Sequence, residues 1–426
     1  MTIAPSPSST STPALPGFPL PQNFLPQNVS SRLISTPDLT FHILESGATP
    51  AKDRPLVILL HGFPEIAYSW RRILPKLADA GYHAVAPDQR GFGRTTGWDT
   101  RPFQEVELHS FSLTNLVRDI IILVHALGYR SVQCVVGHDC GAITASMAAL
   151  MRPDFFRSVV LMSHPFNGSP TLPFDTANEG NGTGTGSLEK QATLAEQGGG
   201  GGAEGSAAAS GIHEALAQSG RKHYKWYYST EEANSDMSSL ALEDLHRFMR
   251  GYFHLKSASW PGNQPRPLKG WTAEEVMQMP YYYIMPLDDT MPQAVEKHMV
   301  GDPSQGKSSY SWLPEDELAV YVAEYARTGF QGGLNWYRVR TAAGGIYTKD
   351  YDLFAGKKIE TPCSFISGGK DWGTYQEPGA LEKMTSGAVC SDFRTLKVLD
   401  GVGHWIPQEA PDEVVQTVID LTKGLA

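Results

Sequence analysis

The sequence has few cysteines, no long apolar run and no excess of positive charge, and each absence excludes a class of protein. Its 426 residues include only four cysteines, Cys134, Cys140, Cys363 and Cys390, which are too scattered to predict a disulfide framework or a zinc site. No run of about 18 apolar residues is present, so we expect no transmembrane helix. The formal net charge of −10 argues against nucleic-acid binding, which needs a basic surface.

The amino-terminal segment also lacks the features of a targeting signal. Residues 1–24 are rich in Pro, Ser and Thr but contain no basic residue and no compact apolar region, so they resemble neither a signal peptide nor an Arg-rich transit peptide. The carboxyl-terminal residues carry no common lipidation or address signal. We therefore predict a reduced, cytoplasmic compartment without a stable membrane anchor. The oligomeric state stays open, with a homodimer among the alternatives.

The sequence does contain an alternation of strand-like and helix-like segments. Residues 32–44 alternate apolar and polar residues, which is typical of a half-buried antiparallel pair. Residues 56–60 form a continuous apolar run, which is typical of a strand buried on both faces. The same character recurs at residues 83–86, 132–136, 158–162, 364–367 and 395–399. Amphipathic helical patterns cover residues 113–127 and 142–151. This alternation predicts an α/β protein with a mostly parallel, doubly wound sheet.

The alternation stops between about residues 165 and 348, where helical, aromatic-rich sequence predominates. Residues 212–251 and 314–337 are expected to be largely helical. Residues 170–211 are dominated by Gly, Ser, Thr, Ala and Asn, a composition that predicts a flexible insert. We therefore predict four segments, which are a disordered tail at 1–30, the first part of a core at 31–164, a helical lid at 165–348 and the second part of the core at 349–426.

The most specific motif is Val-Val-Gly-His-Asp-Cys-Gly-Ala at residues 135–142. A predicted buried strand runs into this segment and a predicted helix follows at once. This is the pattern of a nucleophile elbow, Gly-x-nucleophile-x-Gly, with Asp139 where Ser usually stands. Glycines are needed there because the strained turn brings backbone segments too close for side chains. The alternative is that Asp139 only caps the helix.

An aspartate at this position changes the chemistry that the turn can perform. A carboxylate that attacked an ester carbonyl would form an unproductive anhydride, but a carboxylate can displace a leaving group at a saturated carbon and form an alkyl ester. Water can then cleave that ester at the aspartate carbonyl. Asp139 therefore points to epoxides or alkyl halides as substrates, and it excludes a serine esterase at this turn.

Two further segments supply the partners that such a nucleophile needs. The loop His-Gly-Phe-Pro-Glu at residues 61–65 follows the buried strand at residues 56–60. In a nucleophile-elbow fold this loop and the residue after the nucleophile provide the oxyanion hole, which assigns the backbone N–H groups of Phe63 and Cys140 to that role. An ordinary Gly-Pro turn is the alternative.

A histidine and a second aspartate lie near the carboxyl terminus. His404 stands in a Gly-rich loop just after a predicted strand, and Asp371 ends the preceding strand. The chain order of Asp139, Asp371 and His404 is the order nucleophile, acid and base of α/β-hydrolases. We expect His404 to activate water and Asp371 to orient it, with a simple turn residue as the alternative for Asp371.

Five blocks together resemble the soluble epoxide hydrolase family. They are HGFPEIAYSW, DQRGFG, GHDCGA, GGKD and GVGHW, and the resemblance covers about residues 32–426 except the Gly-rich insert. It implies an α/β-hydrolase fold with a mostly parallel eight-stranded sheet, flanked by helices and carrying a helical cap between core strands. It also implies conversion of a small-molecule epoxide to a vicinal diol with water, without a cofactor or metal.

Two more blocks resemble the part of the family cap that carries a pair of tyrosines. HYKWYY at 223–228 matches the first block and assigns Tyr224, with Tyr227 and Tyr228 as alternatives, and GLNWYR at 333–338 assigns Tyr337. The family pair hydrogen-bonds the epoxide oxygen and donates a proton, which suits tyrosine because it stays protonated at neutral pH. Packing is the alternative role for such aromatic residues. We further expect substrate contacts from His61, Pro64, His138, Trp336 and Trp405.

The sequence leaves several alternative functions open. A haloalkane dehalogenase shares the Asp nucleophile but normally has Trp where this chain has Cys140, and a haloacetate dehalogenase would need arginines near residues 111–114, which contain none. The thiol of Cys140 could itself be reactive, although a small core residue is the simpler interpretation. A non-catalytic receptor with the same fold is the last alternative, and the intact set of Asp139, Asp371 and His404 argues against it.

Overall fold

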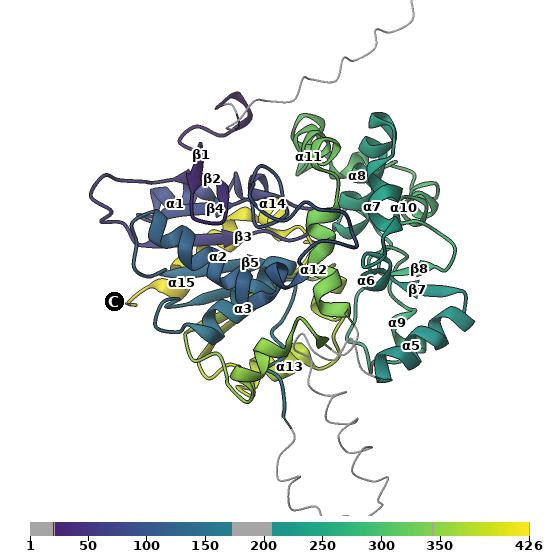
Figure 1. Ribbon diagram of the computed structural model, residues 1–426. Coiled ribbons are helices and arrows are strands. Elements are labelled where there is room, and N and C mark those ends of the chain that lie inside the picture. The colour runs from purple at the N-terminus through teal and green to yellow at the C-terminus, as the bar shows by residue number, and fades with distance from the viewer. Residues whose placement is uncertain (1–19, 21, 173–206, 343–344, 426) are drawn as a thin grey trace, which may run out of the picture.

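The computed structural model describes residues 20, 22–172, 207–342 and 345–425. Residues 1–19, 21 and 173–206, which fall in the predicted tail and the predicted Gly-rich insert, lie outside this described part. Figure 1 shows two unequal parts, a core built around a sheet and a mainly helical part at one end of it. The C-terminus lies on the core, at the end far from the helical part.

The centre of the core is an eight-stranded sheet with the strand order β1-β2-β4-β3-β5-β6-β9-β10. The β1–β2 and β2–β4 pairs are antiparallel and all the other pairs are parallel, so the predicted mostly parallel sheet is confirmed. The strands are β1 Ser30–Ser35, β2 Thr40–Ser46, β3 Leu56–Leu60, β4 His83–Pro87, β5 Cys134–His138, β6 Val159–Met162, β9 Cys363–Gly368 and β10 Phe393–Leu399.

The register of the parallel strands brings their carboxyl ends to one edge of the sheet. Leu60 of β3 pairs with Gly137 of β5, which pairs in turn with Leu161 of β6. On the other side of β6, Met162 pairs with Ile366 of β9. Loops that leave these strands therefore start side by side, as is usual for ligand sites in open α/β sheets.

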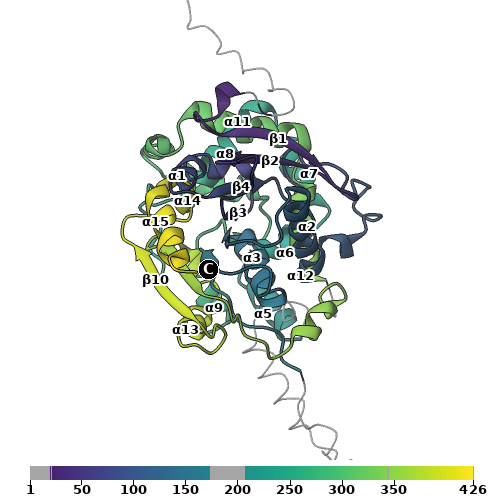
Figure 2. The same cartoon turned by 90° about the vertical axis from the view of Figure 1, so that its left-hand side faces the viewer.

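Helices cover both faces of the sheet, as expected for buried apolar strands. All residues of β3, β4, β5, β6 and β9 are buried. Figure 2 shows α1, α14 and α15 on one side of the strands and α2 and α3 on the other. The core helices are α1 Leu74–Asp79, α2 Leu113–Ala126, α3 Cys140–Met151, α13 Ala380–Thr385, α14 Ile406–Glu409 and α15 Pro411–Thr422. Short 3-10 helices are η1 Gln22–Phe24, η2 Ala67–Trp70, η3 Leu108–Phe111, η6 Lys307–Ser311, η8 Lys349–Phe354 and η9 Trp372–Thr374.

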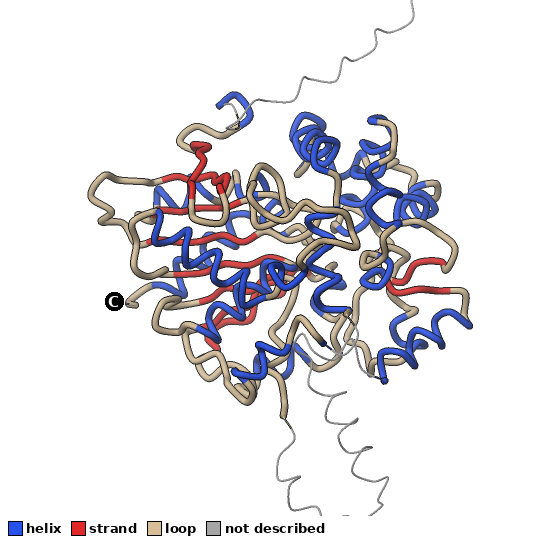
Figure 3. The backbone as a smooth tube through the Cα atoms, in the orientation of Figure 1, coloured by secondary structure: helices blue, strands red, loops and turns tan. Residues whose placement is uncertain are grey.

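The chain leaves the sheet after β6 and returns to it at β9, and between these strands it forms the helical part, called here the cap. Its helices are α5 Ala207–Gln218, α6 Tyr224–Tyr227, α7 Glu232–Ser238, α8 Leu242–Lys256, α9 Ala273–Val276, α10 Met291–Met299, α11 Glu315–Thr328 and α12 Gln331–Thr341. Figure 3 shows that helices dominate the cap. In the described part of the chain, no helix combines the length and the apolar character that crossing a membrane requires.

Two features of the cap differ from the sequence-based expectation. The short strands β7 (Arg221–His223) and β8 (Ile284–Pro286) form an antiparallel pair that the helical pattern did not indicate. Helix α5 begins at Ala207, within the segment predicted to be a flexible insert up to residue 211. The β7–β8 pair depends on tertiary context, as strand pairing generally does, whereas α5 begins with three alanines, which have the highest helix propensity.

Helix α12 lies closer to the core than side chains would normally allow. A Cβ atom on Gly332 would lie 1.9 Å from the backbone oxygen of Gly91, in the DQRGFG loop that follows β4. In addition, the indole N–H of Trp336 donates a hydrogen bond to the backbone oxygen of Arg90 at 2.9 Å. These contacts hold α12, and with it Tyr337, against the carboxyl edge of the sheet.

Candidate active site

Asp139 occupies the sharp turn between β5 and α3. Its backbone angles are φ 52° and ψ −121°, a conformation that non-glycine residues adopt only under local strain. A Cβ atom on Gly141 would lie 2.2 Å from the backbone oxygen of Leu60, so only glycine fits this crossing. The side chain of Asp139 makes no capping hydrogen bond to α3. Its geometry is therefore that of a nucleophile elbow, and the helix-capping alternative has no support.

The carboxylate of Asp139 lies at the predicted oxyanion hole. The backbone N–H of Phe63 donates a hydrogen bond to Oδ1 of Asp139 at 3.2 Å, and the N–H of Cys140 also favours the charged carboxylate. Burial opposes ionisation, but the positive charge of Lys256 and the His404 ring outweigh it and hold the pKa of Asp139 well below its usual range. Asp139 is therefore ionised at neutral pH.

His404 stands between the two aspartates. Its Nδ1 atom lies 2.9 Å from Oδ1 of Asp371, and its Nε2 atom lies 3.6 Å from Oδ2 of Asp139. Asp371 Oδ1 also accepts the backbone N–H of Gly373 at 2.7 Å, which fixes the carboxylate. Burial lowers the pKa of His404, the charge of Lys256 lowers it further, and together they exceed the opposite effect of Asp371. A neutral imidazole at this position can accept a proton through Nε2.

The two predicted cap tyrosines come together above the nucleophile turn. The ring centroids of Tyr224 and Tyr337 are 5.9 Å apart. The hydroxyl of Tyr224 donates to Oε1 of Gln376 at 3.4 Å, and the hydroxyl of Tyr337 accepts from Sγ of Cys140 at 3.8 Å. Burial raises the pKa of both tyrosines well above the usual range, and the charge of Asp139 contributes in each case. Both hydroxyls therefore keep their protons at neutral pH.

The hydroxyl groups of the two neighbouring tyrosines, Tyr227 in α6 and Tyr228 just after it, have other partners. The hydroxyl of Tyr227 donates to Oδ2 of Asp236 at 2.8 Å, and the hydroxyl of Tyr228 donates to the hydroxyl of Tyr252 at 3.4 Å. Tyr224 differs from both because the charge of Asp139 acts on it directly. This effect of Asp139 supports Tyr224 among the three alternatives, while the ring of Tyr228 lies closer to that of Tyr337, with centroids 5.1 Å apart.

Among the residues expected to contact substrate, two lie buried in the loop after β3. His61 accepts the backbone N–H of Gln89 through Nε2 at 3.1 Å, and its Nδ1 atom lies 2.9 Å from the oxygen of Gly62. Pro64 is buried next to Phe63. Because both ring nitrogens of His61 have protein partners, we assign His61 to holding the oxyanion loop.

The indole N–H groups of the two tryptophans, Trp336 and Trp405, also donate hydrogen bonds to backbone oxygens. The indole of Trp405 donates to the oxygen of Phe253 at 2.7 Å, and Trp336 donates to Arg90 as described above. The ring of Trp336 lines a small cavity together with Cys140, and the ring of Trp405 lies 4.6 Å from that of His404. Their rings are therefore the parts that border the site.

A buried ion pair behind His404 was not identified from the sequence. Nδ1 of His138 lies 2.5 Å from Oε2 of Glu65, and Nε2 of His138 lies 2.7 Å from the backbone oxygen of His404 and 3.1 Å from Oγ of Ser163. Burial opposes the charged form, but Glu65 raises the pKa of His138 above its usual value. His138 was expected to bind substrate, but both of its nitrogens already have partners, so we assign it to positioning His404. The only sequence signal was Glu65 at the end of the HGFPE block.

The side chain of Cys140 borders the site as an uncharged thiol. It is buried, and burial together with the charge of Asp139 raises the pKa of its thiol to about 12. The thiolate is the reactive form of cysteine, so the reactive-thiol alternative has no support at neutral pH.

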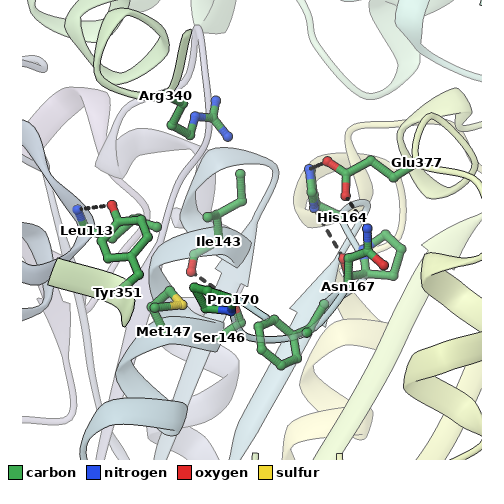
Figure 4. A pocket seen from close by; sticks show the side chains of 13 residues that line it. Leu113, Ile143, Ser146, Met147, His164, Asn167, Pro170, Arg340, Tyr351 and Glu377 are labelled. Carbon is green, nitrogen blue, oxygen red and sulfur yellow. Dashed lines mark hydrogen bonds and ion pairs between the residues drawn. The ribbon is translucent and has the colours of Figure 1, made fainter. Parts of the chain in front are cut away.

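Two adjoining cavities lead along α3 toward the nucleophile turn. The smaller, of about 10 Å³, reaches Cys140 and Trp336 and shares Leu113, Ile143, Arg340 and Tyr351 with the larger, of about 60 Å³. Figure 4 shows the larger cavity, with Ile143 and Met147 on one wall and His164 and Glu377 on another. Its further lining residues are Ser146, Pro165, Phe166, Asn167, Gly168 and Pro170. The walls along α3 are largely apolar.

Among the described residues, no group of three or more His, Cys, Asp or Glu side chains is arranged to hold a metal ion.

Known proteins resemble the chain along nearly its whole length. The family described as alpha/beta hydrolase fold matches residues 55–184. An epoxide hydrolase of Caballeronia sordidicola is 30% identical over 91% of both chains, and Epoxide hydrolase A of Mycobacterium tuberculosis is 28% identical over 93% of this chain and 98% of that one. Among solved structures, an epoxide hydrolase from an endophytic Streptomyces has a TM-score of 0.66 at 28% identity, covering 94% of this chain and 97% of its own. With the elbow aspartate, its histidine and the paired tyrosines in place, the chain belongs to the epoxide hydrolase family of the α/β-hydrolase fold.

Proposed function

We propose that this protein converts an epoxide to a vicinal diol through an ester on Asp139 that water then cleaves. The observation that carries the proposal is the unequal environment of the two carboxylate oxygens. Oδ1 of Asp139 accepts the N–H of Phe63, whereas Oδ2 lies 3.6 Å from Nε2 of His404. These two contacts support a scheme in which Oδ1 becomes the oxyanion and Oδ2 attacks the epoxide.

In the first step, Oδ2 of Asp139 attacks one epoxide carbon from the side opposite the ring oxygen. The new carbon–oxygen bond forms as the ring carbon–oxygen bond breaks, and the ring oxygen takes a proton from Tyr224 or Tyr337. Their hydroxyls supply this proton because burial keeps them protonated at neutral pH. The products of this step are an alkyl ester of Asp139 and a tyrosinate.

In the second step, water attacks the carbonyl carbon of the Asp139 ester while Nε2 of His404 takes its proton. Asp371 holds Nδ1 of the imidazole, and the amides of Phe63 and Cys140 stabilise the oxyanion on Oδ1. The ester bond then breaks, and the departing alkoxide takes the proton from His404. The proton left on the carboxyl group returns to the tyrosinate, so the cycle consumes one water.

The cap would cover the substrate during both steps. We place it at about residues 165–348, as the sequence suggests, because α6 and α12 within this range carry the two tyrosines. The apolar wall formed by Leu113 of α2 and by Ile143 and Met147 of α3 supports an epoxide with an apolar or aryl substituent. We also assign the protein to the cytoplasm, because all four cysteines are buried and free.

Diol formation from a panel of aryl and alkyl epoxides tests the activity, with Asp139→Ala as the control. We expect turnover by the parent and none by Asp139→Ala. The His404→Gln variant should form the ester but not hydrolyse it, so intact-mass analysis should show an adduct equal in mass to the substrate. A parent without turnover on any epoxide, or a His404→Gln variant without the adduct on a known substrate, would refute the two-step scheme.

A further inference from the structure

Lys256, the last residue of α8, carries a buried ammonium group beside the active site. The residue is only 3% exposed. Four aromatic rings surround the ammonium, with Nζ lying 4.9 Å from the ring centroid of Tyr283, 5.3 Å from that of Tyr252, 5.4 Å from that of Trp405 and 6.0 Å from that of Tyr282. Ring faces attract cations at such distances, so these rings, called here the aromatic cage, hold the charge in place.

The charge of Lys256 has no adjacent carboxylate. Among the described residues, no carboxylate forms an ion pair with its Nζ within 4.0 Å. A buried charge without a partner is costly and is normally compensated or used. Burial opposes the ionised form of Asp139, and the charge of Lys256 is the first of the groups that lower the pKa of that carboxyl, so the two opposite charges favour each other.

The backbone of the same residue fixes the loop that carries the base. The N–H of His404 donates to the backbone oxygen of Lys256 at 3.0 Å. The ring of Trp405 contacts both groups, because its centroid lies 4.6 Å from that of His404 and 5.4 Å from the ammonium. Lys256 is therefore tied to both the nucleophile and the base, although it is part of the cap.

We propose that Lys256 is a positioning residue whose fixed positive charge balances Asp139 and keeps His404 in the neutral form that accepts a proton from water. This inference rests on the proposed function. The role of Lys256 extends the proposed function, because this cap residue would act through the nucleophile and the base rather than on the substrate.

The proposed role follows from how charge moves during the reaction. Asp139 loses its negative charge when the ester forms, and Lys256 then becomes the uncompensated charge near His404. A positive neighbour disfavours premature protonation of the imidazole, so the base stays available until water attacks. When the oxyanion forms on Asp139, a negative charge returns to the same place and Lys256 balances it again.

Several other charged or titratable groups contact His404 or Lys256, or lie on the same elements. They are Asp371 at Nδ1 of His404, His138 with Glu65 behind it, Glu409, which accepts the N–H groups of Gly403 and Trp405, His254 paired with Asp302, Arg250 paired with Glu315, and the tyrosines of the aromatic cage. All of them remain when Lys256 is replaced, so a comparison of variants at this position isolates the effect of its charge.

The test compares Lys256→Met and Lys256→Gln, which remove the charge, with Lys256→Arg, which keeps it. The rate of ester hydrolysis is followed against pH in single turnovers quenched for intact-mass analysis. Removing the charge should raise the pH of the acid limb by about one unit, the scale expected of a nearby charge in a protein interior. At a pH below that limb, hydrolysis should then be roughly tenfold slower than in the parent, whereas Lys256→Arg should keep the parent profile.

A second readout needs no substrate. NMR titration of the His404 ring, assigned by its loss in His404→Gln, should show a higher pKa in both neutral variants than in the parent. Equal His404 pKa values in the parent and in folded neutral variants would overturn the role of Lys256, even if their melting temperatures differ. A raised His404 pKa in a protein that forms no diol would instead support the role of Lys256 and refute the proposed function.

Discussion

The two oxygens of Asp139 predict which atoms end in the product. Oδ1 is bound to the N–H of Phe63 and Oδ2 faces His404. If Oδ2 attacks the epoxide and water later attacks the carbonyl carbon, the diol takes its new oxygen from the enzyme. The oxygen of water then replaces it in the carboxylate.

A single turnover in H₂¹⁸O, with enzyme in excess over substrate, checks this. We expect unlabelled diol and one ¹⁸O atom in the peptide that contains Asp139, measured by mass spectrometry. Repeated turnovers should then release labelled diol. Label in the diol at the first turnover would mean that water attacks the epoxide directly, which contradicts the ester.

The hydroxyls of Tyr224 and Tyr337 should matter for ring opening alone. Replacing either with Phe removes one proton donor, and we expect ester formation to slow by about 10²-fold because general-acid catalysis contributes on this scale. Stopped-flow or rapid-quench kinetics of ester formation measures the effect. Tyr227→Phe is the matched control, because its hydroxyl binds Asp236 away from the nucleophile. An equal loss of rate in the control would indicate packing as the role of these rings.

The pH dependence of kcat should reflect His404. Burial and Lys256 lower its pKa below the usual value of about 6.5, so the neutral base persists as the pH falls. We expect kcat to decline only below about pH 6.5, where His404 gains a proton. The buried tyrosines should cause no loss at alkaline pH up to about 10. A titration midpoint of kcat well above pH 6.5 would contradict this assignment.

At the scale of elements, the approach of α12 to the loop after β4 places Tyr337. Gly332→Ala puts a Cβ atom where the oxygen of Gly91 lies 1.9 Å away, so the helix must shift. A displacement of about 1 Å can cost about 10²-fold in rate, and we expect a loss of kcat on that scale in a folded protein. Gly211→Ala in α5 is the control, since nothing lies within 4 Å of its added Cβ. It should leave kcat unchanged.

The elements that the sequence predicted well are those with a strong local pattern. Each predicted core strand is present to within two residues, because continuous apolar runs such as Leu56–Leu60 fit only a doubly covered sheet. The three-residue strand Arg221–His223 was not predicted, because its partner Ile284–Pro286 lies about 60 residues away. In addition, neither segment shows an alternation of apolar and polar residues.

The residues of the site likewise divide into those that lie in sequence motifs and those that do not. Motifs with a fixed order along the chain contain Asp139, Asp371 and His404, so these residues could be identified from the sequence alone. Lys256 stands in no motif, and its importance appears only when α8 packs beside the loop of His404. The ion pair of Glu65 and His138 likewise joins residues 73 positions apart.

At the scale of the whole molecule, buried ion pairs join the core to the cap. Arg94, in the loop after β4, binds Glu324 of α11 with Nη2 to Oε1 at 2.7 Å, and both side chains are nearly fully buried. Glu324 also binds Arg327 through Oε2 at 2.5 Å. Such ion pairs resist separation of the core and the cap, because breaking them would leave unpaired charges in a partly apolar interface.

Glu324→Gln should therefore destabilise the whole protein. Removing one partner of a buried pair costs roughly 3–5 kcal/mol, so we expect a loss of this size in the free energy of unfolding, measured with urea. Asp392→Asn, which breaks a partly exposed local pair with Arg394, is the control and should change stability by no more than about 0.5 kcal/mol. Equal losses in the two variants would show that the core–cap pair has no special weight.

The placement of the cap between β6 and β9 also bears on how such a protein can evolve. These strands are hydrogen-bonded neighbours, with Met162 opposite Ile366, so the sheet already holds the two ends of the excursion together. Lengthening a closed segment then costs little entropy, about 0.6 kcal/mol for each doubling in length. Insertions, deletions and exchanges between lineages can accumulate there while the reactive turn stays intact, so the range of epoxides accepted can diverge faster than the chemistry performed on them.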